Sequence, residues 1–406
     1  MNKIVLLIIL FVSTLSASFS GVIVDKTTSA PVPDTIISDS AQSIKSDSNG
    51  SFSINSKENT YHVKAYGYRP LSFTSDTNTS TILVEPITVK ALYLTYWGAN
   101  NNSLTLKNML KIIDNTEINA VVMDVKNEYG STSFLTSFKQ ANSYGAQKTR
   151  TNRNIQKFIQ MMKKRNIYVI ARVVVFKDEI QASHNPGYAL KKEKTGKIWR
   201  NADSMAWVDP FDKRGHDYTI RIAEEAAKVG FDEINFDYIR FPAKTGLCFS
   251  QKNSQKNRVK AIGEFIDRAQ NKLRKYGVFI SVNTYGNICW SKDDNGIGQT
   301  VTELAKHADY LAPMLYPSGF SSGSFYFKRP SDHPYEVIYR SISNIKERID
   351  TKRVRPWLQY FRDYKHKRPY KKFEVQEQIR AAEDINTSGW MMWSPSSKYH
   401  QNYFIK

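Results

Sequence analysis

From residue 89 onward, short runs of β-branched and aromatic residues alternate with longer stretches whose apolar positions recur at helical spacing. Ile155, Phe158, Ile159 and Met162 fall at i, i+3, i+4 and i+7, which predicts a helix with one buried face, and 262–273 and 337–349 repeat the pattern. Eight strands are predicted, at 91–97, 120–126, 167–176, 232–239, 278–284, 309–316, 354–361 and 389–394. This alternation predicts an α/β fold, a (β/α)8 TIM barrel, with an open doubly wound sheet as the alternative. Only 398–406 remain for an eighth helix, which is expected to be short or missing.

Residues 21–88 carry a different pattern, in which short β runs are separated by Pro, Asp, Ser and Asn-Gly turn signals. They predict a small all-β sandwich domain ahead of a barrel domain at 89–406. The stretches GVIVD, APV, NGSF and YHV through Gly67-Tyr68 resemble the carboxypeptidase regulatory-like domain. That resemblance implies a spacer or adhesion module and brings no catalytic residues.

Residues 1–20 begin with Lys3, continue with an apolar run to Val12 and end in small residues. This is the pattern of a signal peptide, with cleavage expected between Ser16 and Gly21. No later run of about 18 apolar residues appears, so stable membrane insertion is not expected. The predicted location is periplasmic or extracellular.

The composition adds a strong positive charge and many aromatic rings. The chain has 58 Lys+Arg against 38 Asp+Glu, for a formal net charge of +20, with 7 Trp, 23 Tyr and 21 Phe. The charge favours either simple solubility or attraction to an acidic polymer. No nucleic-acid recognition motif accompanies it, so a nucleic-acid partner is not expected. The sequence does not indicate an oligomeric state.

The chain has 2 Cys, Cys248 and Cys289. Each follows a predicted strand, so both would lie in loops at the same end of the barrel. Export to an oxidising compartment makes a disulfide between them a candidate.

The stretch GFDEINFDYIRFP, at 230–242, combines a strand pattern with charged residues at alternate positions. Glu233, Asn235 and Asp237 share one face in a two-residue repeat, while Ile234, Phe236 and Tyr238 share the other. Buried polar groups cost stability unless they find partners or have a task. Asp237 would lie near the carboxyl end of its strand, where parallel barrels place their chemistry.

Two further strands present charged residues in the same way. In AVVMDVKNEYG, Asp124 and Lys126 share a face and Glu128 follows the strand; in YVIARVVVFKDEI, Arg172 and Asp178 share a parity. Asp124 with Lys126 or Arg172 could be a structural ion pair, since an opposite charge keeps a buried carboxylate ionised. The alternative is a catalytic or substrate-binding role.

Aromatic and amide side chains gather at the ends of the last three strands. The candidates are Tyr316, Trp357, Gln359 and Trp393. Flat rings stack on sugar rings and amides bind hydroxyls, so these residues predict a carbohydrate site, with an aromatic barrel core as the alternative.

Other chemistries lack their motifs. The 7 His show no metal-ligand spacing, and neither a Gly-rich phosphate loop nor a Gly-x-Ser-x-Gly elbow is present. Neither a metal nor another cofactor is therefore expected. Paired carboxylates beside aromatic platforms favour glycoside hydrolysis.

The motifs and their order also resemble a known family. They are VVMDVKNEYG, RVVVFKD, WVDP, the 230–242 stretch, PMLYPS, RPWLQ and GWMMWS. Residues 89–396 are similar to the "Putative glycosyl hydrolase domain" family of bacterial exported proteins, related by fold to alpha-amylase-like barrels. In such barrels the nucleophile lies at the end of strand four, which here implies Asp237.

The leading hypothesis is an exported glycoside hydrolase that acts on a bacterial surface or matrix polysaccharide, and the basic net charge favours an acidic one. Asp237 is the first catalytic candidate, with Asp124, Glu128 and Asp178 as partners in that order. Arg172 and Arg240 would keep Asp237 ionised or bind an acidic sugar, and Lys126 is a further binding candidate. Strand five, SVNTYGN, offers no carboxylate. A non-catalytic polysaccharide-binding protein is therefore the main alternative. An esterase or deacetylase is a weaker alternative, because it would require a metal triad or a serine elbow and the sequence shows neither.

Overall fold

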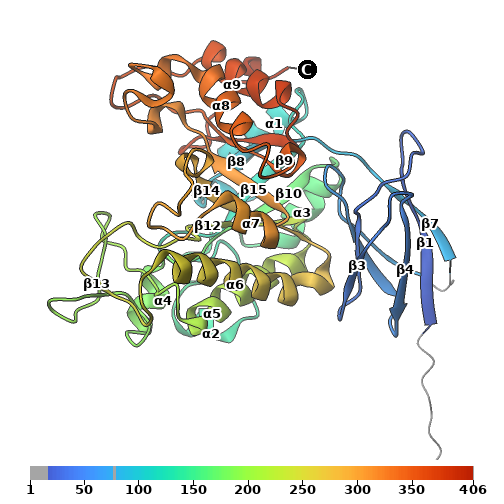
Figure 1. Cartoon of the computed structure of the whole chain (residues 1–406), viewed down its shortest axis with the longest axis horizontal. Helices are drawn as coiled ribbons and strands as arrows, with labels where there is room; N and C mark the ends of the chain where they lie inside the picture. Colours follow the sequence, from blue (N-terminus) through green and yellow to red (C-terminus); the bar gives the residue numbers. More distant parts are fainter. Residues whose placement is uncertain (1–16, 76–78, 406) are drawn as a thin grey trace, which may run out of the picture.

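The chain folds into a closed barrel of eight parallel strands, preceded by two small sheets (Figure 1). The computed structural model describes residues 17–75 and 79–405. The closed strand order confirms the predicted barrel and excludes the open doubly wound sheet. The predicted leader at 1–16 lies outside the described residues.

All eight predicted barrel strands are present, each within a few residues of its expected bounds. They are β8 (Val89–Leu94), β9 (Ala120–Lys126), β10 (Tyr168–Val174), β12 (Glu233–Asp237), β14 (Phe279–Tyr285), β15 (Tyr310–Met314), β16 (Trp357–Gln359) and β17 (Gly389–Trp393). Neighbours in sequence are neighbours in the barrel, and β17 closes it by pairing with β8.

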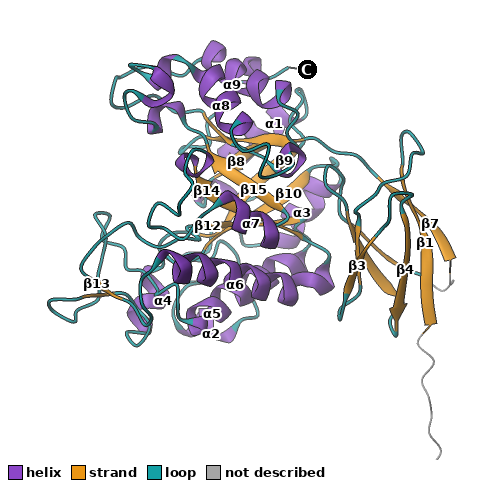
Figure 2. Cartoon of the chain, in the orientation of Figure 1, coloured by secondary structure: helices purple, strands orange, loops and turns teal. Residues whose placement is uncertain are grey.

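Helices follow the strands and surround the barrel (Figure 2). They are α1 (Leu104–Ile113), α3 (Ile155–Lys163), α5 (Lys213–Val229), α6 (Gln255–Leu273), α7 (Val301–His307), α8 (Pro334–Ser343) and α9 (Lys372–Asp384). The last strand is followed by a single turn, η8 (Gln401–Tyr403), as expected from the short tail. The predicted helix through residue 349 is too long, because α8 ends at Ser343. No helix in the described part of the chain is long and apolar enough to cross a membrane.

The alternating pattern of β12 divides its side chains between two environments. Ile234 and Phe236 are fully buried in the apolar layer between the barrel and its helices. On the other face, Glu233 binds Arg355 inside the barrel, and Asn235 donates to the Ser281 hydroxyl at 2.8 Å. The predicted inward face of this strand is therefore confirmed.

The segment ahead of the barrel forms two sheets that pack on a shared apolar core. One contains β1 (Ala17–Asp25), β4 (Ser51–Ser56) and β7 (Thr79–Val84); the other contains β2 (Ile36–Ser38), β3 (Ser43–Lys45), β5 (Thr60–Lys64) and β6 (Leu71–Thr74). The predicted boundary at residue 20 falls inside β1. Phe19 is buried, and its ring stacks on Tyr61 with centroids 4.3 Å apart.

This sandwich docks on the amino-terminal end of the barrel. Lys64, in β5, reaches Asp309 at the start of β15 with an Nζ–Oδ2 distance of 2.8 Å, and both side chains are buried. The Gly67 amide donates to the Tyr310 hydroxyl at 3.1 Å. Figure 1 shows the sandwich on one side of the barrel and β13 (Leu247–Cys248), in the loop after β12, on the opposite side. The sandwich therefore covers the end of the barrel away from the strand-end loops.

Replacing Lys64 with Met should destabilise the protein by about 3 to 5 kcal/mol, because Asp309 would remain buried without its cation. Urea unfolding followed by circular dichroism would measure the change. Lys45→Met is the matched control, since Lys45 makes an exposed 3.9 Å pair with Asp34 in the same sandwich and its loss should cost less than about 1 kcal/mol. Equal effects of both substitutions would contradict the proposed importance of the buried pair.

Candidate active site

A cavity of about 380 Å³ opens at the carboxyl ends of the barrel strands. Its walls come from the ends of most strands and from the loops that follow them. The lining residues are Glu128, Arg172, Asp237, Tyr238, Arg240, Asn283, Tyr285, Gly286, Asn287, Met314, Tyr316, Gly319, Phe320, Trp357 and Trp393. Seven of the residues selected from the sequence are among them.

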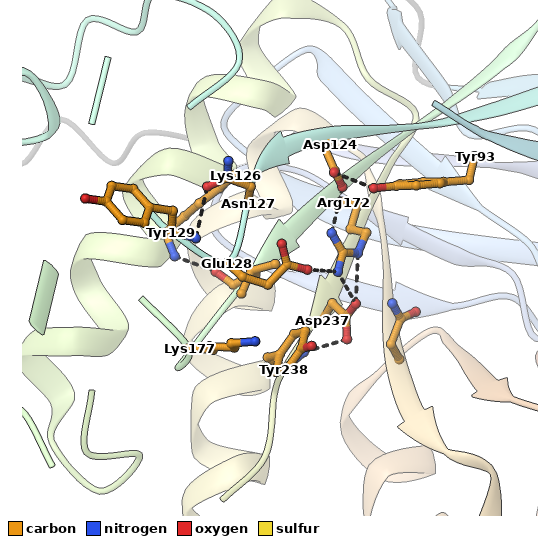
Figure 3. Close-up of polar contacts among 12 residues, drawn as sticks. Tyr93, Asp124, Lys126, Asn127, Glu128, Tyr129, Arg172, Lys177, Asp237 and Tyr238 are labelled. Carbon is orange, nitrogen blue, oxygen red and sulfur yellow. Dashed lines mark hydrogen bonds and ion pairs between the residues drawn. The ribbon is translucent and has the colours of Figure 1, made fainter. Parts of the chain in front are cut away.

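Arg172, on β10, holds three carboxylates together (Figure 3). Its Nη1 lies 2.7 Å from Asp124 Oδ1, and its Nη2 lies 2.7 Å from Glu128 Oε1 and 2.6 Å from Asp237 Oδ2. The Arg172 side chain is only 2% exposed, while the Glu128 side chain is 31% exposed. Faces of Tyr93 and Trp393 cover the guanidinium at 5.9 and 5.2 Å.

Strand register brings this cluster together. Arg172 pairs with Asp124 on β9, and Val174 pairs with Asp237 on β12. Asp124 lies behind Arg172, accepts a 2.5 Å hydrogen bond from the Tyr93 hydroxyl and does not line the cavity. Of the three predicted partners for Asp237, Glu128 is the one whose side chain reaches the cavity.

Lys126 and Asp178 occupy a separate place. The register shifts after the Arg172–Asp124 pair, so Lys126 pairs with Val173. The Lys126 ammonium lies 2.8 Å from Asp178, and both side chains are fully buried. Asp178 also caps α4 (Glu179–His184) by accepting from the Gln181 amide. Neither residue lines the cavity, so we assign this buried pair a structural role behind the cavity wall.

The two-residue repeat places Tyr238 on the face of Ile234 and Phe236; its side chain packs against their apolar layer but also lines the cavity. Its φ of 49° ends the strand and brings its side chain into the cavity wall. The same turn places Arg240 in the cavity. A two-residue repeat cannot reveal such a turn, because the repeat holds only while the backbone stays extended.

Two of the aromatic candidates, Trp357 and Trp393, contact each other in the cavity wall. Trp393 stacks on Tyr93 with ring centroids 4.0 Å apart and meets Trp357 edge-on at 5.5 Å. The Trp357 indole donates to Asn283 Oδ1 at 2.7 Å. Tyr316 lines the cavity, whereas Gln359 is buried and binds the backbone of Ser318 and Phe361 instead.

The sequence analysis missed other lining residues: Asn283, Tyr285, Asn287 and Phe320. The first three lie in SVNTYGN, a stretch that was considered only for carboxylates. Their position at the end of a predicted barrel strand was the available signal.

Comparison with known proteins identifies the barrel. The family described as "Putative glycosyl hydrolase domain" matches residues 91–399, about three quarters of the chain. The chain belongs to this family. No curated protein matches the chain.

Solved structures resemble this glycosyl hydrolase family domain. A hypothetical protein from Ruminiclostridium thermocellum is 35% identical, with 47% of this chain and 96% of that chain covered and a TM-score of 0.43. The PgaB (BpsB) glycoside hydrolase domain from Bordetella bronchiseptica is 14% identical, with 77% and 95% covered and a TM-score of 0.54. The second likeness shows a shared fold.

Two carboxylates of the cluster have pKa values shifted in opposite directions. Burial opposes the ionisation of Glu128, but the charge and hydrogen bond of Arg172 outweigh it and hold the pKa of Glu128 below its usual value. Burial raises the pKa of Asp124, against the opposing charge of Arg172. Burial and the Asp124 charge hold the pKa of Tyr93 well above its usual value, so its phenol remains a donor.

The predicted disulfide does not form, since Cys248 and Cys289 are both free thiols. Cys248 is exposed in β13, which pairs with β11 (Lys191–Lys192) away from the barrel. Cys289 is buried beside α8, and burial raises the pKa of its thiol to about 12. The disulfide prediction failed because the loop after β12 extends outward to join the loop after β10.

The lowered pKa of Glu128 predicts a pH-dependent contribution to stability. This contribution is complete above the pKa of an unfolded glutamate, about 4.3, and is lost as pH falls through the lower folded pKa. The stability difference between wild type and Glu128→Gln should therefore shrink as pH falls from 7 to 2.5. Urea unfolding at stepped pH, with exposed Glu347→Gln as the control, would measure it; a constant difference would contradict it.

Proposed function

We propose that this protein is a glycoside hydrolase that cleaves a polysaccharide at the carboxyl end of its barrel. The observation that carries the proposal is the pair of carboxylates, Glu128 and Asp237, that come from different strands and face one cavity. Family membership and the fold shared with a glycoside hydrolase domain support it. Paired carboxylates are the usual machinery of glycosidic bond hydrolysis.

The distances suit two carboxylates acting on one bond. Glu128 Oε1 and Asp237 Oδ2 lie 2.7 and 2.6 Å from the same Arg172 nitrogen, so these oxygens cannot be farther apart than the sum of the two distances. Retaining glycosidases hold their carboxyl groups about 5 to 5.5 Å apart, whereas inverting enzymes leave about 6.5 Å or more for a water. The close approach favours direct attack by one carboxylate on the sugar.

The environments of the two carboxylates suggest their roles. Asp237 is held by Arg172 through Oδ2 and accepts the Tyr238 amide at 2.6 Å through Oδ1, so it is a fixed anion suited to attack or to stabilise positive charge on the sugar. Glu128 is the more exposed member and touches Arg172 through one oxygen. A bound sugar would exclude water from Glu128 and raise its pKa, which suits an acid/base.

Exposed rings in the loops at the carboxyl end of the barrel support a polymeric substrate. Five of them lie in loops that follow barrel strands: Trp97, Tyr129, Trp290, Tyr326 and Tyr364. Phe320, in the cavity wall, meets Phe325 at 5.0 Å, and Phe325 meets Trp290 at 4.8 Å. A row of rings that leads outward from the cavity offers stacking surfaces for successive sugars.

Release of reducing ends from a panel of bacterial surface and capsular polysaccharides tests the assignment. Glu128→Gln should lower kcat by about 100- to 10,000-fold, and Asp237→Asn should lower it at least as much. Both substitutions preserve size and remove a charge. Glu193→Gln makes the same change on the exposed surface and should act like wild type.

Equal activity of Asp237→Asn and wild type would remove Asp237 from the mechanism. Binding without product from any form would instead favour a non-catalytic polysaccharide-binding protein. The end of β14 supports this second reading, because it contributes Asn283 and Tyr285 to the cavity and no carboxylate.

We also propose that the chain is exported and that its sandwich, which resembles a carboxypeptidase regulatory-like domain, remains as a fixed spacer. Because Phe19 packs in the sandwich core, cleavage should leave it in the mature chain. Expression of the full chain in a bacterial host, followed by intact mass measurement, should give an amino terminus at residue 17, 18 or 19. A terminus at residue 20 or 21, or an uncleaved chain, would contradict this.

A further inference from the structure

The two arginines of the cavity differ in their partners. The charge of Arg172 is shared among three carboxylates. Within residues 17–75 and 79–405, no carboxylate lies within ion-pairing distance of Arg240. Its one hydrogen bond in this part of the chain is from Nη1 to the carbonyl of the adjacent Phe241, at 3.1 Å. Arg240 is therefore a cation in the cavity wall whose charge is not neutralised locally.

Three aromatic rings hold the Arg240 guanidinium. It lies 5.0 Å from the Trp207 ring, 5.3 Å from Tyr238 and 4.9 Å from Tyr285. The rings come from three places: the loop after β10, the turn after β12 and the end of β14. Exposed arginines usually keep mobile head groups, but contacts of this kind favour one position for the cation.

The rings contribute no hydrogen-bond acceptor to the edge of the guanidinium. Of its five N–H donors, one binds the Phe241 carbonyl. The remaining donors form the planar fork that matches a carboxylate, which two parallel hydrogen bonds can hold. Lysine would supply the charge without the fork.

The charge of the cavity makes this cation necessary for an acidic ligand. Glu128 and Asp237 line the cavity, and Arg172 must also neutralise the buried Asp124. A negatively charged sugar would be repelled by this cluster unless another cation held its charge. Arg240 lies in the same wall, three residues beyond Asp237.

We propose that Arg240 binds the carboxylate of an acidic sugar, so that the substrate is a uronate-containing polysaccharide. The inference rests on the proposed function for its site, but it concerns recognition and not bond cleavage. The basic net charge of +20 would further attract such a polymer.

Binding of acidic polymers and their neutral partners tests this proposal. Alginate, polygalacturonate and hyaluronan would each be compared with a carboxyl-reduced form by calorimetry, using Glu128→Gln protein to prevent cleavage. At least one acidic polymer should bind more tightly than its reduced form. Adding Arg240→Gln should weaken that binding about tenfold or more and leave binding of the reduced polymer unchanged.

Two further variants separate local from general charge effects. Arg200→Gln removes the same charge from a loop on the same face, where Arg200 is already paired with Glu179, and should change binding little. Arg240→Lys should restore only part of the affinity, since it keeps the charge and loses the fork. A phosphate-containing polymer, such as a teichoic acid, that competes equally would assign the site to phosphate and overturn the uronate proposal.

The proposal fails if no acidic polymer binds better than its reduced form. It also fails if Arg240→Gln weakens both forms equally, which would give Arg240 a structural role. These outcomes are independent of hydrolysis: selective acidic binding without any cleavage by wild type would refute the glycosidase and retain the recognition role.

Discussion

The candidate active site depends on one buried charge, that of Arg172. A guanidinium inside a barrel is costly unless carboxylates and hydrogen bonds replace the water it has lost. Here Asp124, Glu128 and Asp237 replace it from three segments, and the rings of Tyr93 and Trp393 cover it. Because three segments converge on one group, the position of Arg172 fixes the position of the carboxylates that face the cavity.

Strand register determines whether this cluster can form. Arg172 is opposite Asp124, and Asp237 is opposite Val174, so all the charged groups point inward near one end of the barrel. A shift of one residue in β12 would turn Asp237 outward and Phe236 inward. The apolar faces of β10 and β12, buried beneath the helices, therefore stabilise the site as well as the fold.

The fold could be predicted from the sequence because apolar residues recur at the regular spacings of strands and helices. The two-residue and helical periods identify the eight strands and three of the helices, α3, α6 and α8, and they place Arg172 and Asp237 on inward faces. These spacings cannot predict places where the backbone departs from regular strand or helix geometry. The left-handed turn at Tyr238, the register shift beside Lys126 and the outward course of the loop that carries Cys248 each depend on local backbone geometry.

The candidate site was predicted less completely than the fold, since a strand pattern indicates a side chain's face and not its partners. The sequence ranks Asp124, Glu128 and Asp178, in that order, as partners for Asp237. The structure separates them by contact: Asp178 binds Lys126, Asp124 lies behind Arg172, and Glu128 reaches the cavity. Contacts also distinguish the two arginines: Arg172 binds three carboxylates, whereas Arg240 binds none among the described residues.

The two ends of the barrel have different tasks. At the amino-terminal end, Arg355 binds Glu233 at 2.6 Å inside the barrel, and the sandwich adds the Lys64–Asp309 pair from outside. Both of these pairs are buried, which suits a structural role. At the other end, Glu128 keeps nearly a third of its side chain exposed and Arg240 keeps free donors. Glu128 and Arg240 are thus incompletely satisfied at a place where a ligand can complete their contacts.

The protonation of the cluster connects its structure to its chemistry. Burial raises the pKa of Asp124, whereas Arg172 holds the pKa of Glu128 below its usual value. Glu128 is therefore a carboxylate at neutral pH in the free protein, and an acid role requires its pKa to rise on binding. A sugar that covers Glu128 removes water from the most exposed member of the cluster, and so raises the pKa of Glu128. The exposure of Glu128, more than its distance from Asp237, is therefore what allows substrate to turn a resting carboxylate into a proton donor.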